Sequence, residues 1–350
     1  MLPSHQVLGS ILSTCPVVEC HIRTFSLSVE RTIQGSLSDT LACCAHRLRY
    51  LNVDLPLTTP DLIFLGTLPH LTRLEISMTQ SNIVPKDPIR GAHHFMNLES
   101  LTLDIFDITT CTLLLTRVFH SCRLSQLKVL AAPRRRSSDA QRTEFLRSIG
   151  QITSLEDLRF GLARGGSVEL WVVDFDHLEP LYTLHNLHTF HIYPWAGGPS
   201  PPSLIKYRSF LWQQLHAMSE AWPRLRSLRL MTVDPDYPVI ETTIPAPSIS
   251  PSILPVLLYH FRALTDLTLT LNPFMSEEEL LETKLTMADS PPHPLRFLGL
   301  PCQHSRFLSP NSWTTVKNTW QLCPRLEFIA GKGWEAVWAH YQELARSCSR

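Results

Sequence analysis

The sequence predicts an α/β solenoid in which a parallel sheet lines one face and helices cover the other. Two observations support this fold class. The pattern L-x-x-L-x-L, or a close variant with other apolar residues, recurs along the whole chain, and segments with helical apolar spacing lie between its copies. A strand and a helix that alternate at a fixed period build a parallel sheet with helices on its outer side.

The repeated pattern occurs eleven times between residues 22 and 326. The ten intervals cover 304 residues, so the mean period is about 30 residues, close to the ~20–29 residues of leucine-rich repeats. We therefore expect one right-handed leucine-rich-repeat domain over residues 1–350, shaped as a horseshoe, with the parallel sheet on its concave face and helices and irregular loops on its convex face. The copies of the pattern begin at Ile22, Leu48, Leu71, Leu98, Leu124, Leu155, Leu187, Leu225, Leu264, Leu295 and Leu326.

The spacing within each copy follows from strand geometry. Side chains alternate between the two faces of a strand, so the second and third anchors, two residues apart, point into the same core. The first anchor packs from the turn that enters the strand. In one clear copy the three anchors are Leu225, Leu228 and Leu230, and for the first copy we expect Ile22, Phe25 and Leu27.

Helices are expected between several of these strands. Residues 207–222 place apolar side chains on one helical face, and residues 276–288 open with a serine followed three positions later by a glutamate, as in a capping box. Similar patterns cover residues 140–152 and 311–323.

Two long intervals between copies indicate loop insertions. The intervals that start at residues 187 and 225 are 38 and 39 residues long, and the excess lies at 193–203 and 234–252, which are rich in Pro, Gly and Ser. Such insertions either contribute to the binding face of a solenoid or are neutral, since long loops cost little. Residues 332–350 are expected to cap the C-terminal end of the core.

Composition excludes several classes of partner and chemistry. The 31 basic residues balance the 31 acidic residues, so net charge gives no reason to expect nucleic acid or anionic membrane as a partner. The nine cysteines form no C-x-x-C pair, and the sequence contains no metal, nucleotide or hydrolase motif. We expect no cofactor, no bound metal and no catalytic activity. No signal peptide or apolar run of ~20 residues occurs, so we expect a monomer in the cytoplasm or nucleus.

Two segments carry a resemblance to a known family. WPRLRSLRL at 222–230 and CPRLEFIAG at 323–331 place a Pro-x-Leu turn directly before a strand, and this style resembles the leucine-rich-repeat region of fungal F-box proteins. In that family an N-terminal F-box docks on the adaptor of a cullin–RING ubiquitin ligase, and the repeats recruit a substrate. The first expected repeat leaves no room for an F-box. The resemblance therefore implies a substrate-recognition part, with a ligase adaptor as partner only if an F-box lies upstream.

The concave face is the expected binding surface for a protein partner. Its N-terminal half carries acidic residues, and four consecutive strands are expected to present a basic stripe with a tyrosine and a methionine at its edge. We hypothesise that this stripe receives an acidic or phosphorylated segment, with two arginines as bidentate anchors; the alternative is that these charges only solvate the face. The candidate residues are Asp54, Glu75, Asp104, Lys128, Arg159, His191, Tyr193, Arg229 and Met231.

Other candidate chemistry is weaker. His185, His188 and His191 are three residues apart, and an odd offset in a strand places side chains on opposite faces, so a shared metal is not expected. The basic segment 134–138, RRRSS, suits a nuclear-import patch, a kinase site or a solvated loop. A protein-interaction module is the function the sequence favours; the alternative is a stand-alone repeat scaffold or inhibitor of a protein partner with no link to ubiquitin.

Overall fold

The chain folds into two compact units, residues 1–157 and residues 158–350. The structure is a computed structural model. It describes residues 18–23, 37–42, 44–54, 57–78, 94–105, 108–120, 122–131, 138–163, 171–195, 205–208, 212–231, 249–250, 252–269, 292–299, 323–326 and 328–330.

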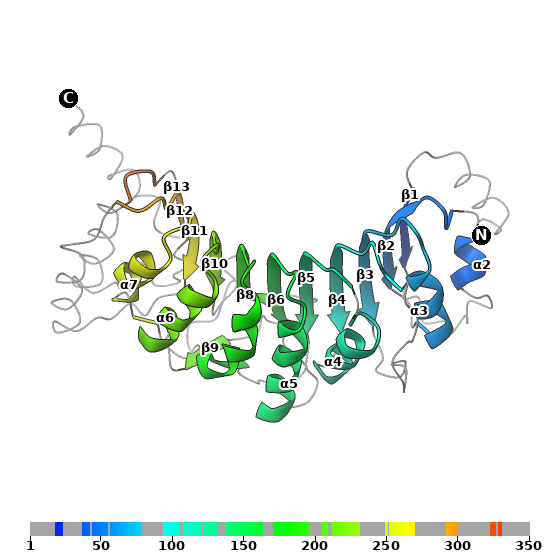
Figure 1. Ribbon diagram of the computed structural model, residues 1–350, viewed down its shortest axis with the longest axis horizontal. Coiled ribbons are helices and arrows are strands. Elements are labelled where there is room, and N and C mark those ends of the chain that lie inside the picture. The colour runs from blue at the N-terminus through cyan, green and yellow to red at the C-terminus, as the bar shows by residue number, and fades with distance from the viewer. Residues whose placement is uncertain are drawn as a thin grey trace, which may run out of the picture. The chain divides into compact units, whose positions relative to one another are not determined.

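The N-terminal unit contains an open parallel sheet whose strand order follows the chain, β1-β2-β3-β4-β5 (Figure 1). Every neighbouring pair in it is parallel. Helices lie on one face of this sheet, as expected for crossovers between parallel strands. The strands are β1 (Val18–Arg23), β2 (Leu48–Asp54), β3 (Arg73–Met78), β4 (Ser100–Ile105) and β5 (Gln126–Ala131), and the helices are α2 (Leu37–Leu41), α3 (Thr59–Gly66), α4 (Ile108–Arg117) and α5 (Asp139–Gly150).

The C-terminal unit repeats this arrangement with the strand order β6-β8-β10-β11-β12-β13. A second, two-stranded parallel sheet pairs β7 with β9 and was not expected from the sequence. The main strands are β6 (Asp157–Ala163), β8 (Thr189–Trp195), β10 (Ser227–Leu230), β11 (Asp266–Leu269), β12 (Phe297–Gly299) and β13 (Phe328–Ala330). The other elements are β7 (Trp171–Asp174), the 3-10 helix η1 (Phe175–Thr183), β9 (Ile205–Arg208), α6 (Trp212–Ala221) and α7 (Ile253–His260).

The core of each unit is formed by the repeated apolar positions. In the copies from residue 48 to residue 269, all three anchors are buried, and in the two later copies the described anchors Leu295, Leu298 and Leu326 are buried too. Alternation within a strand explains this pattern, because anchors two residues apart share the face that meets the helices. The predicted α/β class with an open parallel sheet is confirmed, and the arrangement is compatible with a solenoid.

The turn before several strands repeats one hydrogen-bond pattern. The backbone N–H of the first anchor donates to the carbonyl three residues earlier, for example from Leu225 to Trp222. The next two N–H groups then share one carbonyl just before the preceding strand; those of Arg226 and Ser227 both donate to His188. The whole pattern recurs at residues 98–100, 155–157 and 264–266, and the shared carbonyl also recurs at 296–297. These hydrogen bonds fix the position of the first anchor at the point where strand pairing begins.

The first copy of the pattern differs from the expected frame. We expected the strand near Phe25 and Leu27, whereas β1 spans Val18–Arg23 and pairs Cys20 with Leu51 and Ile22 with Val53. Ile22 therefore occupies the third anchor position instead of the first. The physical reason is the alternation of apolar and polar residues in VECHI, which is the period of a strand with one buried face.

The other expected elements have mixed outcomes. The helices expected at 140–152 and 207–222 are present as α5 and α6, although residues 207–208 belong to β9 instead of helix. Tyr193–Trp195, expected to open the loop at 193–203, belong to β8. Most of both expected loops, the helix expected at 276–288, all but the last residue of the helix expected at 311–323, and the expected cap at 332–350 lie outside the described residues.

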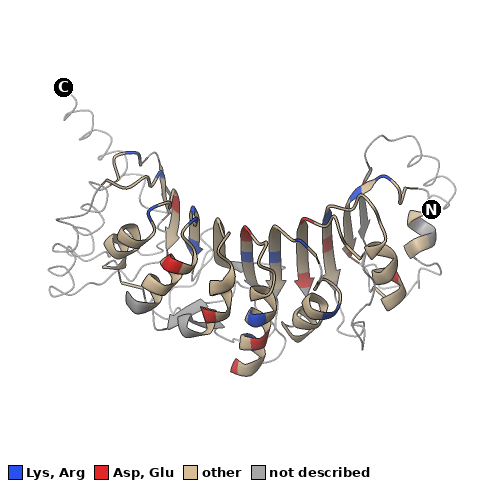
Figure 2. Ribbon diagram, in the orientation of Figure 1, with Lys and Arg blue, Asp and Glu red and all other residues tan. Residues whose placement is uncertain are grey.

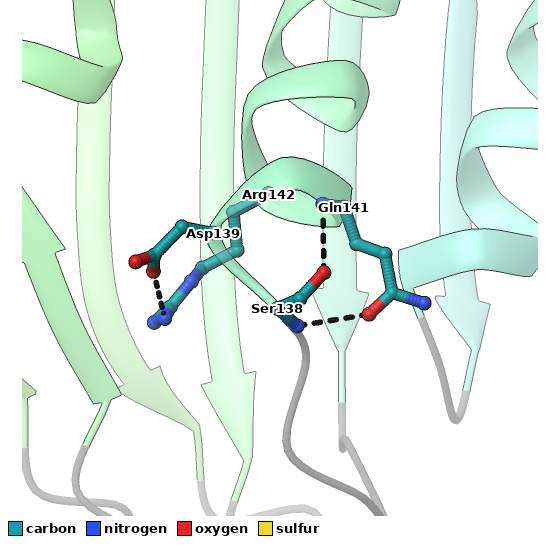
Figure 3. A network of polar contacts seen from close by, with 4 residues as sticks. All are labelled: Ser138, Asp139, Gln141 and Arg142. Atoms are coloured by element: carbon teal, nitrogen blue, oxygen red, sulfur yellow. Dashed lines mark hydrogen bonds and ion pairs between the residues drawn. The ribbon is translucent and has the colours of Figure 1, made fainter.

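Helix α5 begins with a capping box (Figure 3). The Gln141 backbone N–H donates to Ser138 Oγ at 3.2 Å, and the Ser138 backbone N–H donates to Gln141 Oε1 at 2.8 Å. Both bonds satisfy donors that the first turn of a helix leaves without an intrahelical partner. Arg142 also donates a hydrogen bond to Asp139 within the same turn. The negative charge of Asp139 interacts favourably with the helix dipole at this end.

Replacement of Ser138 by alanine is expected to lower the free energy of unfolding by about 0.5–2 kcal/mol, because the Gln141 N–H loses its acceptor. Ser138→Asn is the matched control, since asparagine caps helices about as well as serine. Urea unfolding followed by circular dichroism, with hydrogen exchange of the α5 amides, measures the effect. Equal stability of the alanine variant and the wild-type protein would contradict the capping role.

Candidate functional site

The candidate site in each unit is the face of the sheet opposite its helices, which we call the open strand face. Residues between two buried anchors point to this face. Figure 2 shows basic positions in blue and acidic positions in red on strands of both units. Each of the two units has its own open strand face.

In the N-terminal unit, the register aligns one polar residue from each of four strands. Asn52 pairs with Glu75, Glu75 with Thr102, and Thr102 with Lys128, so these four residues form one row across β2 to β5. All four side chains are half-buried. The row combines acidic, neutral and basic side chains and has no single sign of charge.

The acidic end of this row is held by internal contacts. Asn52 Nδ2 donates to Glu75 Oε2 at 2.8 Å, and the Arg73 guanidinium lies 5.9 Å from the centre of the Tyr50 ring. Burial, as the largest cause, raises the pKa of the Tyr50 hydroxyl above its usual value. These contacts order the face before any ligand arrives, so Glu75 is already engaged within the protein.

Asp104 is the most perturbed carboxyl group on this face. It follows the buried Leu103 on β4 and pairs in register with Leu130, whose side chain is also buried. Burial, as the largest cause, and the charge of Asp54 raise the pKa of Asp104 from 3.8 to about 6, against the opposing charge of Lys128. The apolar neighbour on β5 thus weakens the acidity that the sequence alone suggests.

The raised pKa of Asp104 makes the stability of the protein depend on pH. Because the folded state favours the protonated carboxyl, stability is fully present below the pKa of the unfolded chain, near 3.8, and is lost as pH rises through about 6. Asp104→Asn removes this loss. We expect the variant to match the wild-type protein near pH 4 and to be more stable by about 1–2 kcal/mol above pH ~7, after allowance for solvent screening.

Urea unfolding of both proteins across this pH range measures the difference. Carboxyl groups other than Asp104 titrate in both proteins, so their contributions cancel when the two curves are subtracted. A difference that does not change with pH would show that Asp104 keeps an ordinary carboxyl pKa.

In the C-terminal unit, a second row crosses the open strand face. His191 pairs with Arg229, Arg229 with Thr268, and Thr268 with Gly299. Arg159 lies between the buried Leu158 and Phe160 on β6, the neighbour of β8 in the strand order. We call Arg159, His191 and Arg229 the Arg-His-Arg row.

The members of the Arg-His-Arg row differ sharply in exposure. Both arginine side chains are exposed, whereas His191 is only 7% exposed, although it lies on the same face of the sheet. His191 Nε2 lies 2.9 Å from Ser227 Oγ, within hydrogen-bond distance. Burial, as the largest cause, together with the charges of Arg229 and Arg159 lowers the pKa of His191 from 6.5 to about 3. The ring is therefore neutral at physiological pH.

Tyr193 and Met231 lie one position beyond the third anchors of β8 and β10. Both side chains are half-buried, and the Met231 backbone N–H donates to the Ile192 carbonyl at 3.0 Å, which continues the parallel pairing. They place partly apolar surface two residues beyond His191 and Arg229.

Lys128 belongs to the N-terminal unit, and Arg159, His191 and Arg229 belong to the C-terminal unit. The expected stripe counted His191 among its basic residues; burial and the charges of the two arginines lower its pKa, so the ring carries no charge near neutral pH. Ser227, the partner of His191, was not predicted; its place two residues before Arg229 on the same strand face was the available signal.

The histidines spaced by three do not gather. His185 Nδ1 lies 3.1 Å from the Ala221 carbonyl oxygen, whereas His191 contacts Ser227. Among the residues that the structure describes, no group of three or more His, Cys, Asp or Glu side chains is placed to hold a metal ion. Of the basic segment 134–138, only Ser138 is described, as the cap of α5.

The described cysteines are buried thiols. Cys44, Cys111, Cys122 and Cys323 are buried. Burial raises the pKa of the Cys122 and Cys323 thiols to about 12, so these two groups remain protonated at physiological pH. A protonated thiol is a poor nucleophile, which argues against covalent chemistry at either residue.

Comparison with known proteins gives no family assignment: no protein-family model matches the chain, and no curated protein matches it. In the part of the chain that the structure describes, no helix has the length and apolar character needed to span a lipid bilayer.

Proposed function

We propose that this protein is a protein-interaction module of the leucine-rich-repeat class and that it binds its partner through the open strand faces. The observation that carries this proposal is the alternation along each strand. Leu228 and Leu230 are buried against the helices, while Arg229 between them is exposed on the opposite side. A broad, ordered sheet face with polar rows offers many positions for contacts with another protein.

Two charged groups on these faces favour an external partner. Neither Lys128 nor Arg229 forms a salt bridge with any residue in the described ranges. Residues of this kind on a rigid sheet lose little backbone freedom when a ligand binds, because the strands already fix the backbone. The open strand faces are therefore preorganised for binding.

The leucine-rich-repeat assignment rests on the repeated turns. The first anchor, the shared carbonyl acceptor and the two buried strand anchors recur with the same spacing in both units. Each repeat buries its apolar side chains only by stacking on the next, as in repeat proteins. About eleven irregular repeats between residues 22 and 326 remain our proposed count.

The more specific form of the proposal is a substrate-recognition part of an F-box type ubiquitin ligase receptor. It rests on the resemblance of residues 222–230 and 323–331 to that family. If it is correct, the endogenous protein should co-purify with the cullin adaptor. Partners that bind the open strand faces without the adaptor would favour a stand-alone scaffold or inhibitor.

Site-specific photo-crosslinking tests whether the open strand faces bind proteins. A photoreactive residue replaces Thr102 in the N-terminal unit or Thr189 in the C-terminal unit, both half-buried strand positions. The matched controls carry it at Ala140 on α5 or at His216 on α6, both exposed. We expect discrete protein adducts from the strand positions and none of the same mass from the helix positions. Adducts that form equally from both faces would refute the proposal.

A further inference from the structure

We infer that the Arg-His-Arg row of the C-terminal unit is a docking site for an acidic segment of a partner protein, with both arginines binding its carboxylates and the buried His191, within hydrogen-bond distance of Ser227, as a polar floor. This inference rests on the proposed function and names the chemistry of the partner. The expected partner segment carries carboxylate side chains next to an apolar residue.

The arginines have a spacing that suits two carboxylates. Strands of one sheet lie ~4.8 Å apart, so residues at equivalent positions two strands apart are separated by roughly 10 Å. Arg159 on β6 and Arg229 on β10 lie on either side of β8 in the strand order, and both are exposed. Each guanidinium can form a paired hydrogen bond with a carboxylate, the geometry that arginine favours over lysine.

The local field between the arginines is positive. Both arginines lower the pKa of His191, so each lies close enough to disfavour a further positive charge there. Among the described residues no carboxylate forms a salt bridge with Arg229. The acidic residue on the next strand, Asp266, pairs in register with Ser227 rather than with Arg229 and accepts a hydrogen bond from Thr265 Oγ1 at 2.6 Å. The charge of Arg229 is thus available to a ligand.

His191 and Ser227 shape the floor of the site. Their side chains are within hydrogen-bond distance, and His191 is almost completely buried. A neutral ring between two cations keeps them apart without adding a third charge, whereas a protonated ring would repel both. The predicted consequence is that ligand binding does not follow a histidine titration.

Tyr193 and Met231 extend the site beyond the charges. They lie two residues after His191 and Arg229 on the same strand face, and both are partly exposed. Aromatic and methionine side chains are frequent contacts at protein interfaces. We therefore place an apolar side chain of the partner next to its acidic residues.

A nucleic acid is a less suitable ligand than an acidic peptide. A phosphodiester backbone requires many cations in line, and the Arg-His-Arg row supplies only two because His191 is neutral. The chain as a whole has equal numbers of acidic and basic residues, so it provides no wider positive field.

Fluorescence anisotropy with labelled peptide pools tests the inference on the full chain. One pool carries two glutamates and a leucine at fixed positions among degenerate neutral residues, and matched pools carry glutamine or lysine instead of glutamate. We expect binding of the glutamate pool alone. Arg159→Glu with Arg229→Glu should weaken it by at least about tenfold, since hydrogen bonds to charged groups contribute roughly 1.5–3 kcal/mol each.

The matched control is Arg224→Glu, which reverses an exposed arginine in the turn after α6. It should change binding by less than about twofold, because an exposed charge away from the site acts only through a screened field. Circular dichroism melting curves show whether each variant folds. Arg159→Gln with Arg229→Gln is the second variant if charge reversal prevents folding, and the same loss is expected from it.

The pH dependence separates this inference from a histidine-driven site. Between pH ~5.5 and ~8, binding of the glutamate pool should change by less than about twofold, because the pKa of His191 is about 3. An increase of tenfold or more as the pH falls through ~6.5 would show that His191 is protonated with an ordinary pKa and would overturn the neutral floor.

Several further results would overturn all or part of this inference. No binding of the glutamate pool, or binding that survives both arginine substitutions, overturns the inference. Tighter binding of a labelled single-stranded oligonucleotide, or at least tenfold tighter binding of a pool with phosphoserine in place of glutamate, overturns the choice of carboxylates. If the peptides fail while Thr102 and Thr189 still yield strand-specific adducts, only this inference fails; if both fail, the proposed function fails as well.

Discussion

Replacement of Trp222 by alanine is expected to lower the free energy of unfolding by about 3–5 kcal/mol. Trp222 follows α6 directly and is completely buried, and its ring centre lies 4.9 Å from that of Phe190 and 5.8 Å from that of Tyr182. Its indole Nε1–H donates to the Leu181 carbonyl at 3.1 Å. Truncation therefore creates a large cavity and removes a buried hydrogen bond that joins α6 to η1.

Trp222→Phe separates these two contributions. Phenylalanine keeps most of the ring packing but cannot donate to Leu181, so we expect a smaller loss of about 1–3 kcal/mol. Urea unfolding followed by far-ultraviolet circular dichroism measures both variants without depending on tryptophan fluorescence. If the alanine variant lost less than about 1 kcal/mol, Trp222 would not lie in a packed core.

Much of the fold could be predicted because leucine spacing has a direct physical meaning. The frame of Leu225, Leu228 and Leu230 places three side chains in one core only if the chain forms a turn followed by a strand. The same reasoning failed at the first repeat, where Phe25 and Leu27 matched the letter pattern and Cys20 was overlooked. The register of β1 places Cys20 level with Leu51, at a position where the letter pattern calls for leucine.

Irregular elements could not be predicted from the repeat. The strands β7 and β9 pair with each other across about 30 residues of chain and follow no leucine frame. Tyr193–Trp195 extend β8 although they include a proline, a residue that favours loops. Whether these residues form strands depends on their pairing with distant segments, and local composition does not show which segments pair.

The sequence predicts which residues lie on the open strand faces, but it does not predict their pKa values. Alternation along the strands was enough to bring Glu75, Lys128 and Arg229 to the open strand faces. The pKa values of Asp104 and His191 depend on depth of burial and on neighbours from other strands. Sequence shows which groups can titrate, whereas only the packing shows which of them keep their ordinary charge.

The adjacent residues Leu228 and Arg229 provide the sharpest test of the architecture. Leu228 is completely buried and Arg229 is exposed, so alanine substitutions one residue apart should have very different effects. We expect Leu228→Ala to lower the free energy of unfolding by about 2–5 kcal/mol through lost burial and a new cavity, and Arg229→Ala to change it by less than about 0.5 kcal/mol.

Urea unfolding of the two variants measures this difference in stability. We expect peptide binding to show the opposite order of effects. Arg229→Ala should retain full stability but weaken binding of the glutamate pool, while Leu228→Ala, assayed at a temperature where it remains folded, should bind as the wild-type protein does. Equal destabilisation by both substitutions would mean that the strand has no free face. That result would refute both the stacked core and the open binding surface, because both depend on the same alternation of side chains.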